Sequence, residues 1–429
     1  MKTFNSFLTN SNDYNINEGG AYGHLSHIFE DHDLTFSDLY ELIDLAVEGS
    51  LLEKNFTTEK IDGRNILITA KDGKLRIARS MGQVKNYGET TLTPEDAIEK
   101  FKGHIVEDIF SSAFKELSYY FELLDNNIKT EVFKNGKIFL NVKIQYKEKR
   151  VTIPYSSNAL IFSGIREYDI NGNVIDENSN EVPNKLANAI NELNKPSNFI
   201  YRITGPIRIQ MDRPSDVEEM RTKFKTTLNS IQKRFNISED TKIEEYYKKR
   251  LEEEVLKDFP DVKNDETLKE NLNRIFNRIL FFDKSYSLID IKKDFEKYPE
   301  FRNFVLTSEK SKELERIRVS IIEPIEVLFT QLGVYVLKNA YGFINGKDSE
   351  EAALIKREVR DTIDKLKVDK SPEALFTMSK YLRKFDNAGG FDAVVPIEGI
   401  VFSYKGKVYK FTGAFAAFHK LVSFYNFQK

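Results

Sequence analysis

The sequence predicts an α+β protein in which a large all-helical segment interrupts a domain of antiparallel sheets. Short runs of β-type residues occupy residues 55–88 and 132–175, and they resume after residue 386. Between residues 211 and 385, apolar residues instead recur every three or four positions, which is typical of amphipathic helices. A hairpin of about 40 residues is too small to fold alone. We therefore expect residues 1–210 and 386–429 to form one domain around an insertion at 211–385; three independent domains are the alternative.

The first half of the chain alternates between helical and strand patterns. A helix is predicted from its apolar spacing at Phe36, Leu39, Leu42, Ile43 and Ala46. The Asp72-Gly73 pair indicates a hairpin within the β-type run that ends at Gly88. Residues 94–126 return to helical spacing. Further strands are expected at 137–142 and 159–162, before a turn at Asn171-Gly172.

The second half begins with a predicted capping box, in which Ser215 pairs with Glu218. The longest predicted helix contains Pro324, which we expect to kink it. The last strands are expected at 397–402 and 408–411, joined by a turn at Lys405-Gly406. The mixed charges of the helical segment favour a solvated surface over a nucleic-acid track, and a protein partner is a further option.

Composition narrows the class of protein. The 429 residues are 40% hydrophobic and 31% charged, with a formal net charge of −3. No apolar run approaches the roughly 20 residues of a membrane span, so we expect no membrane partner. Cysteine is absent, which excludes disulfides and thiolate metal sites. A cytoplasmic location is expected. The net charge does not indicate a general nucleic-acid binder, so any phosphate-binding surface must be local.

The most informative pattern is Lys60-Ile61-Asp62-Gly63, which lies between two predicted strands. A lysine can attack the α-phosphate of a nucleotide once it is neutral, and its ordinary pKa is about 10.4. An aspartate two residues later can orient the lysine or hold a ribose or a metal. The glycine lets the backbone approach the nucleotide. An exposed strand lysine in a chance pattern is the alternative interpretation.

Two segments near the other end of the chain accompany this motif: Glu398-Gly399-Ile400-Val401-Phe402 and Val408-Tyr409-Lys410-Phe411. Together the three segments resemble motifs I, IV and V of the covalent nucleotidyltransferases, the superfamily of ATP-dependent DNA and RNA ligases and mRNA capping enzymes. Residues 18–27, 153–155 and 159–169 are similar to the RNA-ligase-like proteins of large tailed phages. The resemblance covers residues 15–210 and 386–420, and it implies an ATP-grasp-like ligase adenylylation fold.

This resemblance implies roles for particular residues. Lys60 would be the nucleophile that forms a covalent lysyl–AMP intermediate. Lys410 and Lys407 would neutralise the α-phosphate, and Glu398 and Asp62 would hold Mg²⁺ or Mn²⁺. The remaining nucleotide contacts would come from Glu59 at the adenine, Gly63 in the motif, Arg79 at a phosphate or acceptor end, and Phe162 stacked on the purine. Alternatively, Phe162 is a core residue and Arg79 faces solvent.

The sequence departs from the superfamily pattern in three places. Lys143 stands where a ribose-binding glutamate is expected, so either Asp62 or another acid replaces it, or adenylylation is weakened or lost. Motif V keeps only the first of its two usual lysines, Lys410. Only 19 residues follow Lys410 in the 429-residue sequence, which leaves no room for a C-terminal OB-fold. The last departure favours an RNA ligase over a DNA ligase or capping enzyme.

Three histidines form a second cluster: His24, His27 and His32, next to Glu30, Asp31 and Asp33. Histidine and carboxylate side chains at such spacing can ligate a transition metal such as Zn²⁺. Alternatively, they cap or line the start of the first helix, or they line the nucleotide site.

The expected function is an ATP-dependent RNA ligase, or a ligase-like nucleotidyltransferase, that passes AMP from Lys60 to a 5′-phosphate nucleic-acid end. If the protein is phage-encoded, it would act in the host cytoplasm. Two alternatives remain open. AMP is transferred to an acceptor other than nucleic acid, or the chain is a catalytically degenerate ligase fold that binds nucleic acid or a virion protein.

Overall fold

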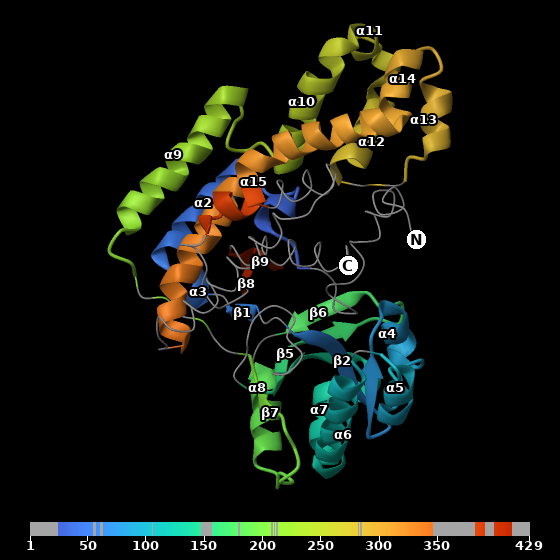
Figure 1. Ribbon diagram of the computed structural model, residues 1–429, viewed down its shortest axis with the longest axis vertical. Coiled ribbons are helices and arrows are strands. Elements are labelled where there is room, and N and C mark those ends of the chain that lie inside the picture. Colours follow the sequence, from blue (N-terminus) through green and yellow to red (C-terminus); the bar gives the residue numbers. More distant parts are fainter. Residues whose placement is uncertain are drawn as a thin grey trace, which may run out of the picture.

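In the residues that it describes, the computed structural model contains two sheets and a large group of helices (Figure 1). It describes residues 25–54, 57–60, 63–104, 106–146, 157–178, 181–206, 209, 211, 213–281, 283, 285–345, 382–390 and 399–413. The pairing between neighbouring strands is antiparallel, except that β7 runs parallel to β5. The α+β class predicted from the sequence is therefore confirmed.

The larger sheet has six strands in the order β3-β2-β4-β5-β6, with β7 added beside β5. Its strands are β2 (Arg64–Lys71), β3 (Lys74–Ala78), β4 (Ile138–Gln145), β5 (Ala159–Tyr168), β6 (Val174–Asn178) and β7 (Arg202–Thr204). The predicted Asp72-Gly73 hairpin joins β2 to β3, and both turn residues have the positive φ of a type I′ turn. Residues 81–88 were expected to continue the strands, but they form the short helix α4 (Met81–Gly88).

One face of the larger sheet is apolar and is covered by helices. Its residues, which include Ile66, Val142 and Phe162, share a core with the long helix α6 (Glu107–Leu123). The other helices of this part are α5 (Pro94–Lys100), α7 (Asn126–Phe133) and α8 (Glu181–Asn191). Side chains alternate between the two faces of a strand, so Asn65, Asn141 and Lys143 lie on the face turned away from α6.

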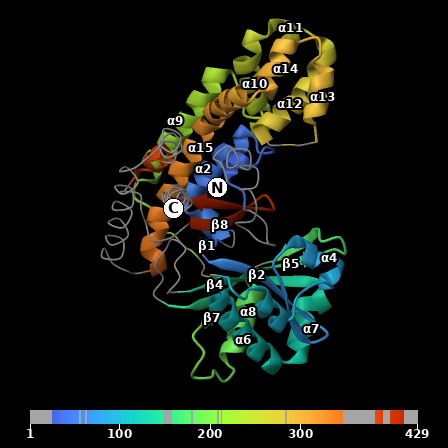
Figure 2. The same ribbon diagram turned by 45° about the vertical axis from the view of Figure 1, so that its right-hand side comes forward.

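The smaller sheet has the order β1-β8-β9 and joins strands from opposite ends of the sequence. Its strands are β1 (Thr58–Lys60), β8 (Gly399–Tyr404) and β9 (Lys407–Thr412). The predicted turn at Lys405-Gly406 connects β8 to β9, again with positive φ at both residues. Figures 1 and 2 show this sheet on the side of the larger sheet opposite to α6 and α7.

A second core joins the smaller sheet to the helices. Ile400, Phe402 and Phe411 of the sheet are buried together with residues of α2 (Phe36–Glu48) and of α15 (Ser308–Asn345). The segment predicted as an insertion thus shares its core with the N-terminal helix and with β8 and β9. The remaining helices are α3 (Ser50–Lys54), α9 (Val217–Phe235), α10 (Ile243–Val255), α11 (Pro260–Lys263), α12 (Lys269–Phe281), α13 (Leu288–Asp294) and α14 (Pro299–Leu306).

The helix α15 is the longest element and carries the apolar face predicted from the sequence. Ile321, Ile325, Leu328 and Leu332 are buried on it, and the helix runs without interruption through Pro324. By length and composition alone, residues 313–340 are apolar enough to cross a membrane. In the structure, 44% of the most apolar 18-residue window of this helix is buried inside the protein.

The start of α9 differs from the sequence prediction. Asp216, not Ser215, is the residue that precedes the helix, and it makes no side-chain capping bond. Glu218 pairs instead with Arg221, one turn further along α9. Glu218 does not take part in a capping box, because its carboxylate is paired with the guanidinium group of Arg221.

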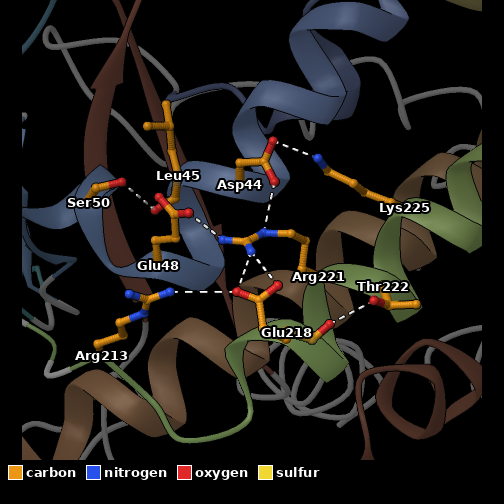
Figure 3. A network of polar contacts seen from close by, with 9 residues as sticks. All are labelled: Asp44, Leu45, Glu48, Ser50, Arg213, Glu218, Arg221, Thr222 and Lys225. Carbon is orange, nitrogen blue, oxygen red and sulfur yellow. Dashed lines mark hydrogen bonds and ion pairs between the residues drawn. The ribbon is translucent and has the colours of Figure 1, made fainter.

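Arg221 is the centre of a polar network that joins α9 to α2 (Figure 3). Its guanidinium contacts Asp44 at 3.2 Å, and it also pairs with Glu48 and Glu218. Lys225 adds a second ion pair to Asp44, with 2.7 Å between Nζ and Oδ2. The Arg221 side chain is only 21% exposed, so this network is screened less by solvent than an ordinary surface pair.

Replacing Arg221 by methionine is expected to destabilise the protein by about 1–2 kcal/mol, because three carboxylates lose a shared cation. Urea unfolding measures the loss, which should shrink at high salt. Arg274→Met is the matched control, since Arg274 is 51% exposed and its ion pair with Glu270 lies within a single helix. Equal effects of the two variants would contradict a special role for Arg221.

Candidate active site

The smaller sheet brings the three predicted motifs together. Lys60 of β1 is paired with Gly399 of β8, which in turn is paired with Thr412 of β9. The next row on the same face consists of Thr58, Val401 and Lys410. Lys60 and Lys410, which are 350 positions apart in the sequence, thus project from one face of the same three-stranded sheet. Strand spacing places their Cα atoms roughly 12 Å apart, within the combined reach of two lysine side chains.

Gly399 is required between these lysines. A Cβ atom built on Gly399 would lie 2.2 Å from the carbonyl oxygen of Phe411, a distance at which the two strands would have to separate. The position therefore carries no side chain. In the row formed by Lys60, Gly399 and Thr412, no side chain stands on the central strand. Lys60 is half-buried, whereas Lys410 is only 6% exposed.

The structure corrects the role expected for Lys407. Lys407 lies an odd number of positions before Lys410, so its side chain leaves the opposite face of β9. There its Nζ lies 2.9 Å from Asp31 and 3.3 Å from Asp33. Lys407 thus serves to attach β9 to the segment before α2, and it does not lie beside Lys60.

Arg79 and Phe162 also lie elsewhere than expected. Arg79 turns towards the helices, with its guanidinium 5.1 Å from the ring centre of Phe110 and 5.7 Å from that of Phe101. Burial lowers the pKa of Arg79, and the charge of Arg64 lowers it further. Phe162 is completely buried in the core of the larger sheet. Both side chains point towards α6 on the covered side of the larger sheet. Neither lies on the face of the smaller sheet that carries Lys60 and Lys410.

Motif I connects the two sheets. Lys60 ends β1 and Gly63 precedes β2, where a Cβ built on Gly63 would lie 3.6 Å from that of Lys143. Lys143 is therefore next to the lysine motif. Asp62 and Glu398, the predicted metal ligands, lie outside the described residues, and so does the side chain of Glu59.

The histidine cluster is only partly within the described residues, since His24 lies outside them. His27 begins a short 3₁₀ turn, and its backbone N–H donates to Glu30 at 2.7 Å. His32 packs against Phe281 with 3.8 Å between ring centres, and its burial lowers its pKa against the opposing effect of nearby carboxylates. No group of three potential metal-ligating side chains occurs in the described ranges.

His32 lines a pocket of about 420 Å³ next to the β8–β9 hairpin, together with Glu30, Asp31, Asp33, Glu244 and Lys407. Asp31 anchors this region, because it is only 9% exposed and accepts hydrogen bonds from both Lys407 and Tyr409. The backbone N–H of Lys410 also donates to Ser26 at 3.0 Å. The segment around His27 thus runs alongside the strand of motif V.

The stability of the protein is expected to depend on the charge of Asp31. Burial would raise the pKa of Asp31, but the hydrogen bonds from Tyr409 and Lys407 outweigh it and hold the pKa below the ordinary 3.8. A lowered folded-state pKa stabilises the fold above the unfolded-state pKa, and this contribution is lost as pH falls through the folded-state value.

Asp31→Asn should therefore lower the free energy of unfolding near pH 7 by about 1–3 kcal/mol. It should also reduce the further loss of stability that the wild type shows as the pH falls below ~4. Urea unfolding between pH 7 and pH 2.5 measures both effects. Asp96→Asn is the control, because Asp96 is exposed on α5. An acid limb of unchanged slope in Asp31→Asn would contradict this assignment.

Two asparagines on the face of the larger sheet turned away from α6 were not nominated from the sequence. Asn65 and Asn141 each have a buried Oδ1 that, among the described residues, accepts no hydrogen bond. Asn141 is only 2% exposed. Asparagine is depleted in strand interiors, so an asparagine in the centre of an apolar strand was a signal that the sequence contained.

No protein-family model, curated protein or solved structure matches this chain. The arrangement of Lys60, Gly399 and Lys410 on one sheet face is therefore the principal guide to its chemistry.

Proposed function

We propose that this protein is an ATP-dependent nucleotidyltransferase of the RNA ligase type, in which Lys60 forms a covalent lysyl–AMP intermediate. The observation that supports this most strongly is the pairing of β1, β8 and β9. The pairing brings Lys60 next to Gly399 and puts Lys410 on the same face, which supports a shared role of the two lysines at one nucleotide. A chance occurrence of the lysine motif offers no reason for these distant segments to meet.

The proposed reaction starts with attack of the neutral Lys60 Nζ on the α-phosphorus of ATP. An N–P bond forms, the bond from the α-phosphorus to the bridging oxygen breaks, and pyrophosphate leaves, while the amine proton passes to solvent. Lys410 is well placed to stabilise the negative charge that increases on the α-phosphate oxygens. A 5′-phosphate of RNA then takes the AMP, and a 3′-hydroxyl displaces AMP to form the phosphodiester.

The polar side chains of the described residues suit a phosphorylated ligand that also carries hydroxyl groups. Two lysines share the face of the smaller sheet, and buried amide oxygens lie on the face of the larger sheet turned away from its helices. For a divalent metal, Asp62 and Glu398 are the proposed ligands, and carboxylate oxygens suit Mg²⁺ or Mn²⁺. The metal would supply charge neutralisation at the phosphates.

A second candidate is a degenerate ligase fold that binds nucleic-acid ends or a protein without catalysis. Lys143 favours this alternative, because it stands beside Gly63 where an acid would otherwise bind ribose. Transfer of AMP to an acceptor other than nucleic acid is the remaining alternative. The two enzymatic alternatives share the covalent step at Lys60 and differ in the acceptor of AMP, whereas the degenerate fold lacks the covalent step.

The experiment that separates them is incubation of the full chain with ATP labelled at the α-phosphate and with Mg²⁺ or Mn²⁺. Label retained on the denatured protein supports the covalent intermediate. Transfer of this label to 5′-phosphorylated RNA supports ligase chemistry, and label that no nucleic acid removes supports another acceptor. ATP binding without any label under either metal would overturn the covalent mechanism and favour the degenerate fold.

A further inference from the structure

Asn141 is a deeply buried polar residue on the face of the larger sheet turned away from α6. Its side chain is 2% exposed, and among the described residues Oδ1 has no hydrogen-bond partner. A buried acceptor without a donor is destabilising, because folding removes its hydrogen bonds to water and supplies none in return. Such a group is expected where a ligand supplies the missing donor.

A second acceptor of the same kind lies nearby. Asn65 of β2 is paired with Lys143 of β4, and Asn141 is two residues from Lys143 on the same face. The two asparagines are therefore diagonal neighbours across adjacent strands, with about 7–8 Å between them. The buried Oδ1 of Asn65 likewise lacks a donor in the described part of the chain. Two unused acceptors on one face suit a ligand with two neighbouring donors.

The position of this pair identifies which part of a nucleotide it faces. Gly63 of motif I lies directly against Lys143, which neighbours both asparagines on this face. Amide oxygens repel phosphate oxygens, so the acceptors do not suit the triphosphate. They suit hydroxyl groups, which donate one hydrogen bond each. The 2′- and 3′-hydroxyls of a ribose are such a pair.

We propose that Asn141, supported by Asn65, binds the ribose hydroxyls of the nucleotide and replaces the acid that is absent at Lys143. This inference rests on the proposed function, since it concerns the same nucleotide. It assigns a preference for ribonucleotides to two neutral side chains. It also explains how ribose could be bound although Lys143, whose ammonium group accepts no hydrogen bond, stands at the expected position of the acid.

The test measures binding of ATP, 2′-deoxy-ATP and 3′-deoxy-ATP by calorimetry, with the metal chelated so that no chemistry occurs. The wild type should bind ATP about tenfold more tightly than at least one of the deoxy analogues. Asn141→Leu should lose this preference, and Asn141→Asp should keep it, because a carboxylate still accepts a hydrogen bond from the hydroxyl group.

Asn277→Leu is the matched control. Asn277 lies on α12 and also has a buried Oδ1 that lacks a partner among the described residues. Both leucine variants should be at least as stable to urea as the wild type, because each removes an unsatisfied acceptor, but only Asn141→Leu should change the preference between nucleotides. Unchanged discrimination in a folded Asn141→Leu protein would overturn the inference.

The remaining outcomes are also decisive. If the wild type binds ATP and becomes labelled but does not distinguish the deoxy analogues, the ribose assignment is wrong and the proposed function stands. If the wild type neither binds ATP nor becomes labelled, the proposed function and this inference fail together.

Discussion

Lys60→Arg is expected to abolish covalent labelling by ATP, with a loss of more than about 100-fold relative to the wild type. Arginine keeps the positive charge and is at least as long as lysine, but its guanidinium does not lose a proton in proteins and so is not a nucleophile. ATP binding should largely persist, which separates loss of chemistry from loss of the site. The measurement is label retained on the denatured chain, alongside nucleotide binding by calorimetry.

Lys74→Arg is the control for this substitution, since Lys74 is an exposed residue in the β2–β3 hairpin. Its labelling should equal that of the wild type. If Lys60→Arg labels as well as the wild type, the AMP is attached to another residue, and peptide mapping of the labelled chain would identify it.

Gly399→Ala is expected to have the second largest effect. The new methyl group would lie 2.2 Å from the carbonyl oxygen of Phe411, so β8 and β9 would have to move apart. We expect a loss of about 2–4 kcal/mol in the free energy of unfolding. Labelling should fall with it even in the folded fraction, because the pairing with Gly399 positions Lys60.

The matched control lies in the same hairpin. Gly406 has a φ of +77°, but a Cβ there would meet no atom within 4 Å. Gly406→Ala should therefore cost only the backbone strain of a positive φ, about 1 kcal/mol, and should leave labelling intact. Urea unfolding and labelling of the two variants, measured together, check the prediction. Equal stability losses would show that the contact with Phe411 is relieved without separating the strands.

Local patterns predicted most of the elements. The helix around Phe36, the hairpins at Asp72-Gly73 and Lys405-Gly406, and the return of strands after residue 386 are all present. These features follow from apolar spacing and from turn residues that accept a positive φ, which act over a few neighbouring positions. The capping box at Ser215 was wrong because Arg221, which α2 holds in place from another part of the chain, takes the carboxylate of Glu218.

For the candidate site, the sequence by itself determined the chemically capable residues Lys60 and Lys410, since their types and local patterns are visible in it. Only the tertiary structure decided which of the nominated side chains share a face. Strand register places Lys60 and Lys410 together, and it turns Lys407 towards Asp31 and Arg79 towards Phe110. A shift of one residue in register reverses the face of every side chain, and register depends on pairing between segments hundreds of residues apart.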